Sequence, residues 1–207
     1  MSSNAAPLSS PYLVLASTSP YRRELLERLR LPFHVEAPLV DEAPLRNEAP
    51  RDTAARLALA KAQEVAARSP GDAVVIGSDQ LAELDGAAIG KPGSHARAVL
   101  QLRALSQRSV VFHTAVAVLR PATGYERLVV VPVAVRFRLL SEAEIENYLQ
   151  AERPYDCAAS AKCEGLGIAL LEAVQSDDPT ALIGLPLIAT ARLLREAGVA
   201  LLGCGAT

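Results

Sequence analysis

Two long runs rich in β-branched residues constrain the fold of this chain more than any other feature. They cover residues 109–119 and 128–139, and residues 120–127, with Pro121 and Gly124, connect them. A connection this short joins antiparallel strands, because parallel strands need a crossover of a dozen or more residues. The runs therefore predict a large hairpin, and the sheet must be built around it.

Units of a different kind come before and after this hairpin. Residues 12–16 form a short apolar run, and the helix after it starts with Ser19 as N-cap and Pro20 as its first residue. Before the large hairpin we also predict an extended segment from 31 to 35, a helix over 52–68, a strand over 73–77, a small hairpin turning at Asp85-Gly86 and a helix from Ser94 to about 105. After it we predict a helix to about 151 that starts with a capping box of Ser141 and Glu144, a strand over 166–174 and a last helical stretch ending near 198.

This order, βα twice, then an antiparallel ribbon, then βα, predicts an α/β fold with a mixed, twisted sheet flanked by helices. The 207 residues suffice for one domain with a real core and are too few for two comfortable domains. We therefore expect a single domain over residues 1–207, with its core at about 12–198 and loose ends.

Composition and charge exclude several classes of function. The net charge of -2 gives no global field for nucleic acid, so any phosphate site must be local. No run approaches the ~18 apolar residues of a membrane span, and the first eleven residues lack the basic start of a signal peptide. The three cysteines include no C-x-x-C pair, which fits a reducing compartment and predicts a cytoplasmic protein.

A cluster of hydroxyls and guanidiniums follows the first apolar run. Ser17, Thr18 and Ser19 precede the predicted helix, and Arg22 and Arg23 fall in its first turn. Cations there oppose the helix macrodipole, which favours anions at that end. Hydroxyls, free helix amides and two guanidiniums would together make a phosphate cradle. The alternative is that both arginines are ordinary solvated residues.

An aspartate follows closely after the predicted strand over 73–77. We expect Asp79 to lie directly after the strand, at a sheet edge where ligand crevices form. A carboxylate there can hold Mg²⁺ or Mn²⁺, or take a proton from water. The alternative is an aspartate that only caps a turn.

Further charged groups are candidates for the same site. Lys91 stands in a tight turn where it could meet a phosphate, and Lys61 lies among alanines on a predicted helix, although either could be solvated. Asp41 and Glu42 lie in an acidic, Pro-rich loop. They would complete a magnesium site only if folding brings them to Asp79.

Other chemistries lack their sequence signals. The three histidines, His34, His95 and His113, are scattered without metal-ligand spacing, and no Ser-His-Asp arrangement is legible. Neither a Walker phosphate loop nor a G-x-G-x-x-G fingerprint is present.

Taken together and in order, the motifs resemble the Maf family of septum-formation-inhibitor-like proteins. The similarity runs from about residue 12 to 198. It rests on residues 13–23, 40–42, 61–62, 76–80, 85–86, 90–92, Thr114, 164–168, 178–179 and 183–187.

The resemblance implies a nucleotide pyrophosphatase with a fold like that of the Maf and ITPase proteins. Ser78, Asp79 and Gln80 resemble the subgroup that acts on 7-methyl-GTP. In that assignment Asp79 accepts a proton, and Tyr21, Gln80 and Glu164 set base specificity. A homodimer is also implied.

We combine these indications into one site. A Mg²⁺ or Mn²⁺ ion would be held by Asp79 and Glu42, and the phosphates of a nucleoside triphosphate would be neutralised by Ser17, Arg22, Arg23, Lys61 and Lys91. Two alternatives stay open. One is a nucleotide-binding regulator of cell division without catalysis, and the other is a house-cleaning hydrolase of broad specificity.

Overall fold

The computed structural model describes residues 11–202, so the predictions for the leader, for the tail from Gly203 and for Cys204 lie outside the described residues. In chain order the elements are β1 (Leu13–Ala16), α1 (Pro20–Glu27), β2 (His34–Glu36), α2 (Pro50–Arg68), β3 (Val74–Leu84), β4 (Ala87–Ile89), α3 (His95–Leu105), β5 (Ser109–Arg120), η1 (Pro121–Thr123), β6 (Tyr125–Phe137), α4 (Glu142–Glu152), η2 (Ala158–Ser160), η3 (Leu166–Leu170), β7 (Leu171–Gln175), η4 (Ala181–Ile183) and α5 (Leu187–Glu196), where η marks a 3-10 helix. Among these described elements, no helix is long and apolar enough to cross a membrane.

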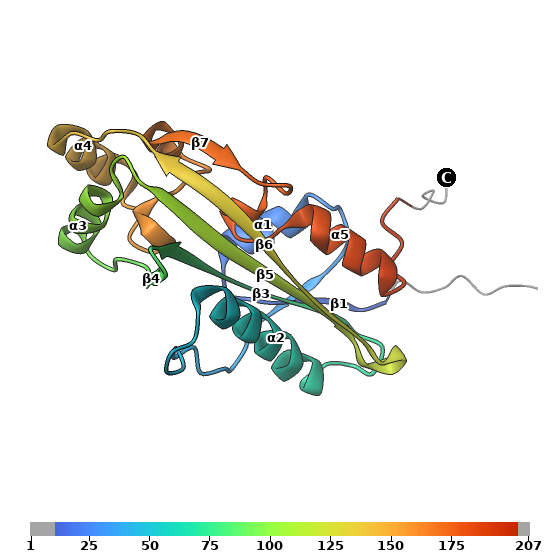
Figure 1. The fold of residues 1–207 in the computed structure, drawn as a ribbon. Coiled ribbons are helices and arrows are strands. Elements are labelled where there is room, and N and C mark those ends of the chain that lie inside the picture. Colours follow the sequence, from blue (N-terminus) through green and yellow to red (C-terminus); the bar gives the residue numbers. More distant parts are fainter. Residues whose placement is uncertain (1–10, 203–207) are drawn as a thin grey trace, which may run out of the picture.

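One seven-stranded sheet organises the molecule. Its order is β2-β1-β3-β5-β6-β7, and β4 pairs with β3 outside that path. Strand β1 is parallel to β2 and β3, whereas β3, β5, β6 and β7 are antiparallel neighbours. Figure 1 shows the long strands β3, β5 and β6 crossing the whole molecule. The prediction of an α/β fold with a mixed sheet flanked by helices is therefore confirmed, and so is the hairpin of β5 and β6.

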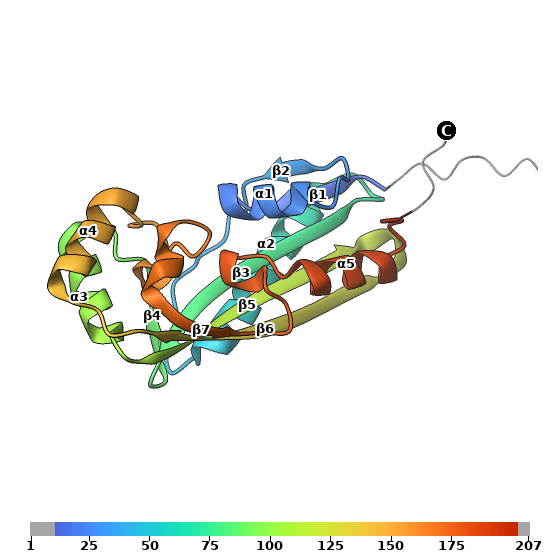
Figure 2. The same ribbon diagram turned by 90° about the horizontal axis from the view of Figure 1, so that it is seen from above.

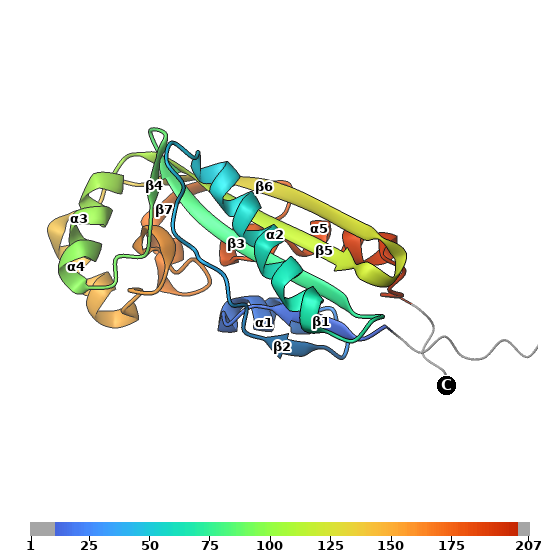
Figure 3. The same cartoon turned by 90° about the horizontal axis from the view of Figure 1, so that it is seen from below.

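Helices cover both faces of the sheet, and the alternation of side chains in β3 decides which residues meet which helix. Val74 and Ile76 pack with α1 and α5, while Val75 packs on the opposite face with α2. Figures 2 and 3 show α5 on one side of the long strands and α2 on the other. By the same alternation Ser78 and Gln80 point to the α5 side, and Asp79 points to the α2 side.

A glycine in β3 allows α2 to pack very close to the sheet. A Cβ on Gly77 would lie 2.7 Å from the backbone nitrogen of Ala62 and closer still to the carbonyl oxygen of Ala58. No larger residue fits between strand and helix here without a shift of the backbone. The contact sets the height of the middle of α2 above β3, which is where Lys61 lies.

A second core lies at the other end of the long strands. There α3 and α4 pack with η2, η3 and the ends of β5 and β6, around buried residues such as Leu102, Phe112, Phe137 and Leu149. Figure 1 shows these two helices grouped at the end of the sheet farthest from the turn between β5 and β6. The two cores share the same strands. The prediction that the whole chain forms one domain stays a prediction.

Two predicted strands have different limits in the structure. The runs 73–77 and 81–84 form the single strand β3, so Asp79 lies in the middle of a strand and not directly after one. The backbone of its polar stretch keeps pairing with β5, where Asp79 is opposite Ala115. The run 166–174 begins as the 3-10 helix η3, because Gly167 winds tightly against the backbone of Lys162.

Candidate active site

A cleft of about 600 Å³ opens where strand β1 ends. The last residue of β1, Ala16, pairs with Gly77, while β3 continues and meets β4 only at Ala82. Among the described strands, none lies beside the edge of β3 between these points on that side, so side chains from both faces of the sheet can meet there. Ligand crevices in α/β sheets lie at the carboxyl ends of parallel strands in the same way. The cleft is lined by residues 17–22, 79–81, 88–91, 156–158 and 182–184 together with Glu42, Lys61, Ala161 and Glu164, among others.

The turn between β1 and α1 forms one wall of this cleft. Ser19 is the N-cap of α1, its hydroxyl accepts from the backbone nitrogen of Arg22 at 3.4 Å, and Pro20 is the first helical residue. Both features of the helix start are confirmed. The buried hydroxyl of Ser17 accepts from the backbone nitrogen of Ser19 at 3.1 Å, which closes the turn.

The structure separates the two arginines of this turn. The Nε atom of Arg22 donates to the carbonyl oxygen of Gly184 at 3.0 Å, and its Nη2 atom lies 4.0 Å from Oδ1 of Asp79. Burial lowers the pKa of Arg22, and the charges of Asp79 and Glu42 partly offset that effect. Arg23 instead pairs with Glu27 on the exposed side of α1, and it is absent from the cleft lining. Only Arg22 is brought to the candidate site.

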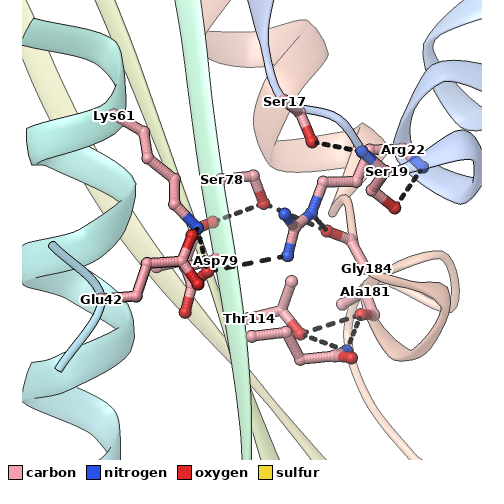
Figure 4. A network of polar contacts seen from close by, with 12 residues as sticks. Ser17, Ser19, Arg22, Glu42, Lys61, Ser78, Asp79, Thr114, Ala181 and Gly184 are labelled. Carbon is pink, nitrogen blue, oxygen red and sulfur yellow. Dashed lines mark hydrogen bonds and ion pairs between the residues drawn. The ribbon is translucent and has the colours of Figure 1, made fainter. Parts of the chain in front are cut away.

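Lys61 lines the cleft and lies between two carboxylates (Figure 4). Its Nζ atom is 2.6 Å from Oδ1 of Asp79 and 2.7 Å from Oε1 of Glu42. The side chains of Lys61 and Asp79 are buried, whereas that of Glu42 is exposed. The hydrogen bond from Lys61 lowers the pKa of Glu42. Folding therefore joins three predicted residues that are far apart in the sequence.

The side-chain amide of Gln80 anchors η4 to the sheet. Its Nε2 atom donates to the carbonyl oxygens of Ala181 and Leu182 at 2.9 and 3.1 Å, and it also contacts the hydroxyl of Thr114 at 2.9 Å. The hydroxyl of Ser78 reaches the carbonyl oxygen of Gly184 at 3.0 Å. These bonds fix the segment that holds Arg22, so Gln80 keeps only its carbonyl oxygen for a ligand.

The far end of the cleft holds an aromatic ring and two further carboxylates. Tyr21 reaches across from α1, and its hydroxyl lies 3.5 Å from Oδ2 of Asp156. Glu164 lines the same end, and burial raises its pKa. The pKa of Tyr21 is also raised, first by burial and then by the neighbouring Cys157 and Asp156. This end of the cleft thus offers a neutral phenol ring next to negative charge.

Two residues of α4 support the segment that carries Glu164. Glu152 pairs with Lys162 at 2.7 Å and accepts from the backbone nitrogen of Leu166 at 2.9 Å. The hydroxyl of Tyr148 donates to the carbonyl oxygen of Ser160. Sequence reasoning missed both residues, because a support ten to fourteen residues away along the chain has no spacing signal.

Of the two remaining predicted residues, one lines the cleft and the other does not. Lys91 lines the cleft from the segment after β4 and is exposed. Asp41 does not line it, since its carboxylate accepts from the backbone nitrogen of Ala43 at 2.9 Å and closes a turn in the loop.

A divalent cation would need ligands from the substrate. Within the described part of the chain, no group of three or more His, Cys, Asp or Glu side chains could hold a metal ion. The carboxylates of Asp79 and Glu42 do share the ammonium of Lys61 and face the cleft. Mg²⁺ is commonly bound through one or two carboxylates plus substrate phosphates. The residues present therefore fit a cation that is shared with a polyphosphate.

The chain is similar to known proteins over most of its length. The family model for the Maf-like protein matches residues 12–197. A 7-methyl-GTP pyrophosphatase of Albidiferax ferrireducens is 60% identical over 92% of this chain and 96% of its own, and one of Polaromonas sp. is 62% identical over 94% and 88%. A third, of Burkholderia pseudomallei, is 58% identical over 96% of this chain and 93% of its own.

Proposed function

Because the chain belongs to the Maf-like protein family, we propose that it is a nucleoside triphosphate pyrophosphatase that hydrolyses the α–β anhydride of 7-methyl-GTP. The products would be 7-methyl-GMP and pyrophosphate. One observation carries the proposal beyond the names of relatives. In this cleft the buried carboxylate of Asp79 lies next to two cations, Arg22 and Lys61. The aromatic ring of Tyr21 and the carboxyl group of Glu164 form the other end of the same cleft.

The phosphates would bind at the cationic end of the cleft. Arg22 and Lys61 are already held in place there, and Lys91 and the hydroxyl of Ser17 line the same space. Such groups stabilise the charge that gathers on the leaving pyrophosphate, so catalysis is mainly positioning and electrostatics. Arg23 stays outside this set, because it pairs with Glu27 away from the cleft.

Asp79 is the group that would take a proton from the attacking water. Its contacts with Lys61 and Arg22 in the described structure both fall on Oδ1. The other oxygen, Oδ2, is left to accept the proton. A general base must lie within hydrogen-bond reach of the water it activates, and the cleft gives Asp79 that access.

Asp79 and Glu42 would hold a Mg²⁺ or Mn²⁺ ion together with oxygens of the triphosphate. When bound, such an ion supplies positive charge at the anhydride that is cleaved. Within the protein, Lys61 already holds both carboxylates at the same place.

The base would lie at the aromatic end of the cleft. Methylation at N7 makes the guanine ring cationic, and a cation over the face of Tyr21 gains ~0.5–2 kcal/mol depending on desolvation. The carboxylate of Glu164 can accept N–H bonds from the guanine edge. The carbonyl oxygen of Gln80 stays available for a further contact.

A substrate panel tests the proposal. The purified protein with Mg²⁺ or Mn²⁺ should release pyrophosphate from 7-methyl-GTP faster than from GTP, dTTP or UTP. A thermal shift with nucleotide but no pyrophosphate would instead indicate a nucleotide-binding regulator. Equal turnover of all four would indicate a house-cleaning hydrolase of broad specificity. The homodimer and the cytoplasmic location stay predictions.

A further inference from the structure

The charged residues that line the cleft are divided between its two ends. Arg22, Lys61 and Lys91 are its cationic residues, and Asp79 and Glu42 lie beside Lys61. Near Tyr21 the lining has two acids, Asp156 and Glu164, and within the described residues neither of them makes a salt bridge, whereas the charge of Lys91 acts on Glu42. The cleft is therefore bipolar along its length.

Asp156 is the acid at this end to which neither the sequence motifs nor the proposed chemistry gives a role. Its Oδ2 atom lies 3.5 Å from the hydroxyl of Tyr21. The nearby lysine, Lys162, is tied to Glu152 at 2.7 Å and does not line the cleft. The carboxylate of Asp156 thus faces the space beside the Tyr21 ring without a cationic partner in the cleft lining.

An aromatic face with carboxylates around it recognises an organic cation. The ring face carries the negative part of the quadrupole of Tyr21, and unit charges of opposite sign attract at short range even in water. A neutral guanine gains hydrogen bonds from such a site but no net Coulomb attraction. A base with a delocalised positive charge gains both.

We propose that Asp156 is a specificity-determining residue, which acts with Glu164 to select a cationic, N7-alkylated purine over the neutral purine of the same shape. The inference rests on the proposed function, because it concerns the base that the same cleft accepts. The cleft as a whole then matches a nucleotide that is positive at the base and negative at the phosphates.

The test is Asp156→Asn, which removes the charge and keeps the size and an oxygen that can accept from Tyr21. The ratio of kcat/KM for 7-methyl-GTP to that for GTP should fall about three- to tenfold, as expected for the loss of one screened charge pair. The value for 7-methyl-GTP should fall, and the value for GTP should not fall with it. Asp177→Asn is the matched control, because Asp177 is exposed and outside the cleft lining.

A binding measurement separates a charge effect from a structural one. By titration calorimetry, 7-methyl-GMP should lose affinity in Asp156→Asn while GMP does not, and added salt should weaken the wild-type preference. Equal losses of affinity for both ligands would overturn the role of Asp156. So would an unchanged ratio of kcat/KM values in Asp156→Asn, if the wild type prefers 7-methyl-GTP. Either result would leave the proposed substrate in place. A wild-type protein without that preference would overturn the proposed substrate as well.

Discussion

The ammonium of Lys61 lies 2.6 Å from one carboxylate oxygen of Asp79, and both side chains are almost completely shielded from solvent. Lys61 comes from the middle of α2 and Asp79 from the middle of β3, so the packing of one helix on one strand creates the pair. A buried charge needs a partner, because an uncompensated one is costly to desolvate. The pair therefore contacts the proposed base through Oδ1 and leaves its second oxygen free.

Replacement of that base should stop the reaction and keep the fold. Asp79→Asn should lower the rate of pyrophosphate release by at least about 100-fold, since an amide cannot accept the proton of water. The amide fits the same space and its oxygen can still accept from Lys61. Turnover and circular dichroism would be measured beside Asp52→Asn, an exposed control on α2. Retained turnover would exclude Asp79 as the base.

The coupling of the pair can be measured separately from catalysis. Lys61→Met should reduce the free energy of unfolding by about 3 kcal/mol, because it leaves the buried Asp79 carboxylate without its closest cation and with the longer contact to Arg22, at 4.0 Å. Adding Asp79→Asn to Lys61→Met should recover a large part of this loss. Urea unfolding of the two single variants and the double variant gives the coupling energy. Simply additive losses would show that the pair is not coupled.

Features set by neighbours in the sequence could be predicted before folding was known. Ser19 caps α1, and Ser141 with Glu144 forms the capping box of α4, because each motif satisfies backbone groups within one turn. The hairpin of β5 and β6 follows from two β-branched runs and a short connection in the same way. The order of strands and helices was enough to predict a mixed sheet.

Features that depend on contacts between distant segments could not be predicted. Arg22 and Arg23 look equivalent in the sequence, but only Arg22 faces the carbonyl of Gly184, far along the chain. Asp79 looked like the end of a strand, because its polarity hid that the backbone continues to pair with β5. The hydrogen bond from the Gln80 amide to η4 likewise depends on where the chain returns after β7.

The close approach of α2 to β3 gives a prediction about how the site is built. Gly77→Ala should lower the free energy of unfolding by about 1–3 kcal/mol, since its Cβ would overlap the backbone of Ala58 and Ala62. Activity should fall as well, because moving α2 away carries Lys61 from Asp79. Gly71→Ala is the matched control, as nothing lies within 4 Å of its Cβ. Thermal melts and pyrophosphate release would be compared, and a neutral Gly77→Ala would contradict this account of the packing.

The raised pKa of Glu164 gives a prediction about pH. Burial raises this pKa above the ordinary glutamate value, the charges of Glu152 and Glu24 add to the shift, and Lys162 opposes it. A carboxyl whose pKa is higher in the folded than in the unfolded protein destabilises the fold when it is charged, and that effect disappears as pH falls below both values. Glu164→Gln should therefore be somewhat more stable than the wild type at neutral pH, and the difference should vanish in acid.

Selectivity should follow the same titration of Glu164. As pH falls through its raised pKa, the wild-type preference for 7-methyl-GTP over GTP should decline, and it should do so at a higher pH than for an ordinary glutamate. In Glu164→Gln the preference should be weaker and should lack this step. Because both proteins meet the same two substrates, dividing one pH profile of the kcat/KM ratio by the other removes the titration of the nucleotides. Parallel profiles for the two proteins would mean that the charge of Glu164 does not read the base.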